Sequence, residues 1–87
     1  MKEYLPLGSV VILKGGEKSV MIYGRKQSHA ETNVEYDYVA CLFPEGNISK
    51  EFTYLFNHDK IGEIIFTGYS NDADKELVAK LTNLDAN

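Results

Sequence analysis

Short apolar runs, rich in β-branched and aromatic residues and separated by Gly and Pro turn signals, fill residues 9–69. The first run covers residues 9–14, and Gly15-Gly16 follows it. Runs of this kind predict strands, and a pair of glycines supplies the positive φ angles that tight hairpin turns require. A return strand is predicted at residues 18–24. The chain therefore has to begin as an antiparallel hairpin.

This hairpin is apolar on both of its faces. If Gly15 and Gly16 form the turn, Val11 pairs with Val20 on one face and Val10 pairs with Met21 on the other. A sheet with one wet face shows a cleaner alternation of apolar and polar residues. The hairpin is therefore predicted to be covered on both sides.

The rest of the strand region contains one long strand and two short ones. They are predicted at residues 34–43, 52–56 and 63–69. On one face of the long strand, Glu35 and Asp37 precede Val39 and Cys41, as expected for a strand that enters a core from the rim of a small curled sheet. Residues 25–33 are polar and predict a solvated loop, residues 44–47 predict a turn, and residues 57–62 predict a turn with a short helical twist.

The C-terminal segment predicts a helix at residues 71–84. Ser70 or Asn71 is a suitable N-cap, and acids follow in the first turns, where the helix dipole favours them. An apolar stripe runs along it at helical spacing. Its members are Ala73, Leu77, Leu81 and Leu84, with Val78 alongside. The stripe is expected either to close one end of the sheet or to dock on a partner.

These elements predict a mostly β, α+β fold in a single domain of residues 1–87. The expected architecture is a small curled antiparallel sheet or SH3-like barrel of about five strands with one C-terminal helix. The longest apolar run, residues 39–43, is far too short to span a membrane.

Charge and cysteine content limit the function and the compartment. The formal charge is −4, from 13 acids and 9 bases, so nucleic acid, itself a polyanion, is a less suitable partner than a basic protein. Cys41 is the only cysteine, so no internal disulfide can form and a reducing compartment is favoured. The first residues lack the apolar core of a signal peptide. The expected location is the cytoplasm.

Chemistry-bearing residues are present but do not form a catalytic pattern. His29 and His58 lack the further ligands of a zinc site. Cys41 lies in an apolar run without a neighbouring cation to activate its thiol. Glu35 and Asp37 are explained by a solvated strand face. The sequence therefore predicts a non-catalytic domain with no catalytic residues, no cofactor and no metal.

Tyrosine is the residue type that most suggests binding. The chain has six Tyr and four Phe but no Trp, and tyrosine suits interfaces because its ring is apolar while its hydroxyl can stay in water. These rings belong either to the core or to a contact surface. The candidate contact surface is the Tyr36 and Tyr38 strand face, the opposite Glu35 and Asp37 face, and the adjoining 25–33 loop with Arg25 and His29.

Several motifs together resemble a bacterial family, the domain of unknown function 4176. They are Leu5-Pro6-Leu7-Gly8-Ser9-Val10-Val11, Leu13-Lys14-Gly15-Gly16, Met21-Ile22-Tyr23-Gly24-Arg25, Tyr36-Asp37-Tyr38-Val39, Pro44-Glu45-Gly46, Tyr54-Leu55-Phe56-Asn57-His58 and Ile64-Ile65-Phe66-Thr67-Gly68-Tyr69. The resemblance spans roughly residues 5–69. It implies a companion of type VII secretion loci in Gram-positive bacteria, often beside LXG-type toxins, and it brings no catalytic residues.

Three functions follow from these features as hypotheses. The first is a cytoplasmic adaptor or chaperone that binds an LXG-type toxin or a secretion component. The second is an immunity protein that covers a basic toxin surface with acids such as Glu35, Asp37, Glu45 and Glu51. The third is a small nucleic-acid-binding barrel that uses Tyr36 and Tyr38. An unpaired sheet edge would also support a homodimer.

Overall fold

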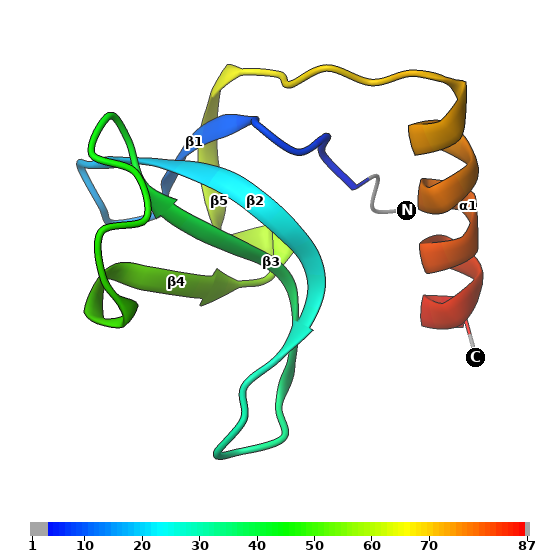
Figure 1. The fold of residues 1–87 in the computed structure, drawn as a ribbon, viewed down its shortest axis with the longest axis horizontal. Helices are drawn as coiled ribbons and strands as arrows, with labels where there is room; N and C mark the ends of the chain where they lie inside the picture. Colours follow the sequence, from blue (N-terminus) through cyan, green and yellow to red (C-terminus); the bar gives the residue numbers. More distant parts are fainter. Residues whose placement is uncertain (1–3, 87) are drawn as a thin grey trace.

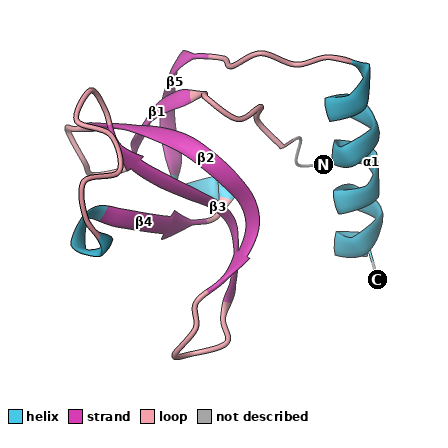
Figure 2. Cartoon of the chain, in the orientation of Figure 1, coloured by secondary structure: helices cyan, strands magenta, loops and turns pink. Residues whose placement is uncertain are grey.

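The computed structural model describes residues 4–86, which form one curled antiparallel sheet and one C-terminal helix (Figures 1 and 2). The strands are β1 (Val10–Leu13), β2 (Ser19–Ser28), β3 (Glu35–Leu42), β4 (Thr53–Phe56) and β5 (Ile61–Phe66), and the helix is α1 (Asp72–Ala86). Short 3-10 helices, Lys50–Phe52 and His58–Lys60, precede β4 and β5. The strand order is β4-β3-β2-β1-β5. The predicted mostly β fold is confirmed, and of the two predicted architectures the structure has an open sheet, because β4 and β5 are not paired.

The predicted register of the first hairpin is confirmed. Val10 pairs with Met21 and Val11 with Val20. The two-residue turn is wrong, because β1 ends at Leu13 and β2 begins only at Ser19. Gly15 has a φ of +80°, and the Gly16 amide donates a hydrogen bond to the Leu13 carbonyl at 3.0 Å. One positive φ, rather than two, therefore reverses the chain.

The second strand is longer than its polar sequence indicates. β2 continues to Ser28, so the predicted loop of residues 25–33 is wrong over its first four residues. A register shift between Ile22 and Gly24 bends the strand, and beyond it Arg25 pairs with Tyr38 and Gln27 with Tyr36. Backbone pairing with β3 extends this arm of the hairpin without apolar burial along most of its length, so most of its side chains can be polar. This is why the alternation of apolar residues does not reveal it.

The sheet has two distinct faces, and residues of the first hairpin are buried on both: Val11 on one and Val10 on the other. Side chains on the inner face build the core together with Tyr4 from the N-terminal segment. The core cluster consists of Tyr4, Val11, Val20, Ile22, Tyr38, Ala40, Leu42 and Phe56. Since side chains alternate along a strand, Val10, Met21 and Cys41 lie on the outer face. The change of β3 from a wet rim to a buried end is also confirmed, since its burial increases from Glu35 to Leu42.

The helix begins where the sequence predicts, but a different side of it is buried. The Asn71 side-chain oxygen accepts the Asp74 amide at 2.9 Å, which confirms Asn71 as an N-cap. Val78 and Leu81 pack against the core, whereas Leu77 and Leu84 are exposed. The predicted stripe is therefore only partly buried. In Figure 1 the helix stands at one end of the curled sheet, beyond the N-terminal segment.

Candidate functional site

The N-terminal segment, residues 4–8, lies between the sheet and α1 and joins them (Figure 1). Tyr4 is buried in the core. The Leu5 amide donates to the Tyr38 hydroxyl at 3.0 Å, and the Leu5 carbonyl accepts from Arg25 Nε at 2.9 Å. The backbone groups of one residue therefore hold this segment to both β2 and β3.

A second tie links this segment to the connection between β5 and α1. Ser9 is fully buried; its hydroxyl donates to the Pro6 carbonyl at 2.7 Å and accepts the Gly68 amide at 2.9 Å. A Cβ at Gly68 would clash with the Leu7 carbonyl oxygen, so only glycine allows this close approach. This contact fixes the chain just before the helix.

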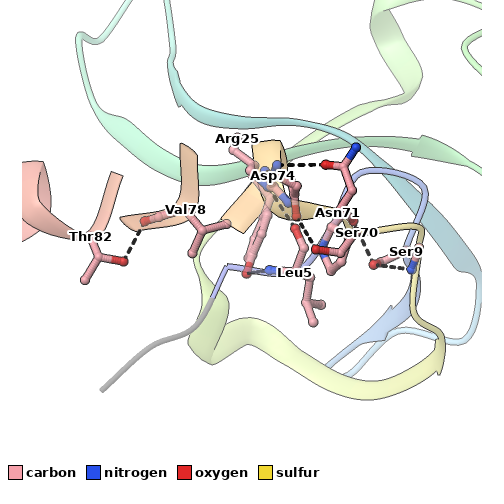
Figure 3. A network of polar contacts seen from close by, with 11 residues as sticks. Leu5, Ser9, Arg25, Ser70, Asn71, Asp74, Val78 and Thr82 are labelled. Atoms are coloured by element: carbon pink, nitrogen blue, oxygen red, sulfur yellow. Dashed lines mark hydrogen bonds and ion pairs between the residues drawn. The ribbon is translucent and has the colours of Figure 1, made fainter. Parts of the chain in front are cut away.

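Arg25 anchors the helix to the sheet (Figure 3). Its side chain is only 4% exposed, and Nη1 lies 2.7 Å from Asp74 Oδ1 on α1. Asp74 Oδ2 also accepts from the Ser70 hydroxyl at 2.8 Å. The hydrogen bond from Arg25 is the largest cause that lowers the pKa of Asp74; the Ser70 hydroxyl and the Arg25 charge add to it, and burial opposes it. Arg25 Nη2 is buried without a hydrogen-bond partner among the described residues.

The anchor corrects one predicted contact residue. Arg25 was expected in a solvated loop, facing a partner. It lies instead in β2 beneath the helix, because its guanidinium finds a carboxylate and a carbonyl inside the molecule. In its observed position it is a structural residue.

Tyr38 is also structural. The residue is completely buried, and its ring packs edge-on against Tyr4 and tilted against Phe56. Its hydroxyl lies 2.7 Å from His58 Nδ1 and accepts the Leu5 amide. A ring in the core cannot contact a partner at the surface, so Tyr38 does not belong to a contact surface.

The remaining predicted contact residues do not form one continuous site. Asp37 Oδ2 accepts the His58 amide at 2.8 Å, so this carboxylate orders the turn before β5. Glu35 is exposed and pairs with Lys26 at 2.7 Å. Tyr36 is half-buried, and His29 accepts the Glu31 amide within the hairpin loop at 3.3 Å. The structure therefore uses most of these side chains for local order.

The described residues were also compared with the requirements of a metal site and of a substrate cleft. No group of three or more His, Cys, Asp or Glu side chains in this part of the chain could hold a metal ion. Cys41 is a free, buried thiol. A cleft of about 600 Å³ lies between the N-terminal segment and α1. Its lining consists of Tyr4, Leu5, Pro6, Thr67, Ser70, Asp74, Lys75, Val78, Ala79, Thr82 and Asn83.

The surface feature that sequence reasoning missed is a group of apolar side chains on β5 and just after it. Ile64 and Ile65 are about half exposed, and Tyr69 is 80% exposed. We call these three residues the β5 edge surface. Among the described strands β5 pairs with β1 alone, so its second edge is open within this part of the chain. The run of β-branched residues predicts a strand here. It does not predict that the strand lies at the edge of the sheet, because strand order cannot be derived from the sequence.

The fold and these surfaces define a class: a small, mostly β domain with apolar side chains exposed on its described surface. The family model for the domain of unknown function DUF4176 matches residues 4–77. The chain therefore belongs to this family, and the match reaches past the Arg25–Asp74 anchor into α1. No curated protein and no solved structure matches the chain. Within residues 4–86, α1 is neither long enough nor apolar enough to span a membrane.

Proposed function

We propose that this protein is a non-catalytic interaction domain that acts in the cytoplasm as an adaptor or chaperone for an LXG-type toxin exported by type VII secretion. The observation that carries the proposal is the β5 edge surface. Its apolar side chains remain in water although the domain has a core in which similar residues are buried. Exposed apolar side chains on and just after an edge strand can serve as a protein-binding surface.

The form of β5 favours binding through side chains. Its pairing with β1 shifts register twice, between Val10 and Val11 and between Ile12 and Leu13. Such bulges bend an edge strand and make it a poor template for adding a further strand. The Tyr69 ring, in contrast, can bury a large apolar area with little loss of conformational entropy.

The charge of the chain and its family both favour an exported toxin as the partner. A net charge of −4 favours encounter with a basic protein surface. The motifs shared with the family imply a companion of toxin loci. An adaptor or chaperone would cover apolar surface on the toxin before export. This role requires binding affinity but no catalytic activity.

The test is co-expression with the LXG-type toxin encoded in the same locus, followed by affinity capture and titration of the purified pair. Ile65→Glu combined with Tyr69→Ala is expected to weaken binding about tenfold or more, because a desolvated charge replaces an apolar contact. Val34→Glu is the matched control, since Val34 has 46% exposure against 50% for Ile65 and lies in the hairpin loop. Equal capture by both variants would refute the proposed surface.

A survival assay separates the adaptor role from the immunity role. Cells that produce the toxin are expected to die whether or not they produce this chain, although the two proteins co-purify. Rescue of growth by this chain alone would show that it blocks the toxin, and the immunity function would replace the adaptor.

A further inference from the structure

The cleft between the N-terminal segment and α1 has the volume of a ligand site. It measures about 600 Å³, within the range of about 300–1,000 Å³ in which proteins hold small ligands. One wall consists of Tyr4, Leu5 and Pro6, and the other is α1. Thr67 and Ser70, from the connection between β5 and α1, complete the lining. We call this site the α1 cleft.

The helix wall of the α1 cleft consists of two rows of side chains, each with a spacing of four residues. One row is Asp74, Val78 and Thr82, which follow one another along the helix in Figure 3, and the other is Lys75, Ala79 and Asn83. Residues four apart lie on the same face of a helix, so both rows run along the cleft. At 1.5 Å per residue, each row is about 12 Å long. Because each row is apolar in the middle and polar at both ends, the wall matches a ligand of this length with an apolar centre.

The polar groups of the helix wall suit the backbone of a peptide. The Ser70 hydroxyl donates its hydrogen to Asp74 Oδ2 at 2.8 Å. The Thr82 hydroxyl donates its hydrogen to the Val78 carbonyl at 2.9 Å. Each hydroxyl oxygen therefore retains only acceptor capacity, which suits a peptide N–H, whereas the exposed Lys75 is a donor for a peptide carbonyl.

The opposite wall offers mainly apolar contact. The Leu5 amide donates to Tyr38 and the Leu5 carbonyl accepts from Arg25. Pro6 has no amide hydrogen, and its carbonyl accepts both the hydroxyl and the amide of Ser9. Since these backbone groups are already used within the chain, a ligand binds this wall through side chains and not by adding a strand.

We infer that the α1 cleft binds an extended segment of the toxin, about four residues long, with an apolar side chain at its centre. Four extended residues span about 13 Å, which matches the length of the helix wall. A helix is about 10–12 Å across with its side chains, so the same length of helix would occupy about 900 Å³ or more and would enter the cleft only in part. The inference rests on the proposed function, because it names the part of the toxin that a second site on this chain binds.

The α1 cleft is continuous with the β5 edge surface along the chain. Tyr69, a member of that surface, lies between the cleft residues Thr67 and Ser70. Its side chain is 80% exposed. A toxin segment that leaves the cleft at the Ser70 end therefore passes next to Tyr69, and one partner can contact both sites.

Charge at the Ser70 end of α1 favours a basic residue next to the apolar centre of the segment. Asp72 and Glu76 are exposed, and helix spacing places them beside the Lys75 row, at the outer rim of the cleft. Asp74 is paired with Arg25. Lys75 is the only base among the described lining residues, so two unpaired carboxylates and one ammonium leave an excess of one negative charge. This excess is complementary to a basic partner.

The first test fills the cleft and measures the affinity of the full chain for the purified toxin. Ala79→Trp is expected to raise the dissociation constant about tenfold, because the ring occupies the space of the apolar side chain of the segment. Ala73→Trp is the matched control, since Ala73 is also exposed on α1 but lies about 120° around the helix; it should leave the constant unchanged. Thr82→Val adds no bulk and removes one acceptor, so it should raise the constant about threefold or more. Urea unfolding checks that each variant folds.

The second test uses short overlapping synthetic peptides that together cover the toxin sequence. One of them is expected to compete with the toxin for the wild-type chain and to bind Ala79→Trp about tenfold more weakly. Toxin binding that no peptide inhibits, or that Ala79→Trp and Ala73→Trp change equally, would overturn the inference and leave the proposed function in place. A wild-type chain that does not bind the toxin at all would refute both.

Discussion

Arg25 shows how one polar side chain can fix the position of an element. The guanidinium is removed from water and makes one bond to the Leu5 carbonyl and one to Asp74. A buried charge without partners is very unfavourable, so the helix side that carries Asp74 must face the sheet. This accounts for the rotation of α1 relative to its apolar stripe.

The anchor predicts a pH-dependent contribution of Asp74 to stability. Asp74→Asn is expected to lower the unfolding free energy by about 1–3 kcal/mol at neutral pH. The folded-state pKa of Asp74 lies below its ordinary value of 3.8. The contribution is therefore fully present above that ordinary value and is lost as the pH falls through the folded-state pKa. Urea unfolding measured from neutral to strongly acidic pH should show that the unfolding free energies of the wild type and the variant differ at neutral pH and become equal only in acid.

Asp72→Asn is the control for this measurement. Asp72 is exposed in the first turn of the same helix. Its replacement by Asn removes one negative charge, as Asp74→Asn does, but leaves the Arg25–Asp74 bond intact. If Asp72→Asn lowered the unfolding free energy by the same amount and with the same pH dependence, helix-dipole effects, and not the Arg25 bond, would account for the result.

Tyr38 predicts a hydroxyl contribution that can be separated from its ring. Tyr38→Phe keeps the packing against Tyr4 and Phe56 but leaves the Leu5 amide without its acceptor and removes the bond to His58. The expected loss is about 1–2 kcal/mol of unfolding free energy, measured by urea titration. Tyr36→Phe, on the same strand but half-buried, should change stability by less than about 0.5 kcal/mol. Equal losses would argue against a role for the buried hydrogen bonds.

At the scale of elements, the helix has a docked side and a free side. Leu81 packs against the core and Leu77, one turn earlier, is about half exposed. Leu81→Ala is expected to cost about 1–3 kcal/mol, whereas Leu77→Ala should be nearly neutral because alanine is the better helix former. Thermal and urea unfolding of both variants would reveal the docked side, and a larger loss for Leu77→Ala would contradict the observed rotation.

The sequence predicts the elements better than their lengths or their surroundings. The glycine pair and the apolar runs were enough to set the register of Val10 with Met21, because hairpin pairing is local. The extension of β2 through Arg25 was not predictable, because it depends on pairing with distant Tyr38. The buried side of α1 likewise depends on Arg25, nearly fifty residues away from Asp74. Contacts of this kind leave no periodic signal.

At the scale of the whole molecule, the contact surface predicted from the sequence differs from the β5 edge surface, because the burial of a side chain depends on the packing of the whole fold. Tyr38 and Tyr69 are the same residue type on predicted strands, yet one is fully buried and the other is 80% exposed. Tyr38 lies in β3, inside the sheet, whereas Tyr69 lies beyond the end of β5, in the connection to α1. The resemblance to the family located the fold, but it supplied no information about which tyrosines face water.

Salt tests the contribution of charge to the proposed complex at the scale of the whole molecule. Binding steered by a basic toxin surface should weaken as ionic strength rises, because counterions screen the attraction between the acidic chain and its partner. Titration of the purified pair in low and moderate salt measures this difference. An affinity that does not change with salt would show that apolar contacts at the β5 edge surface account for the binding and that the net charge of −4 does not.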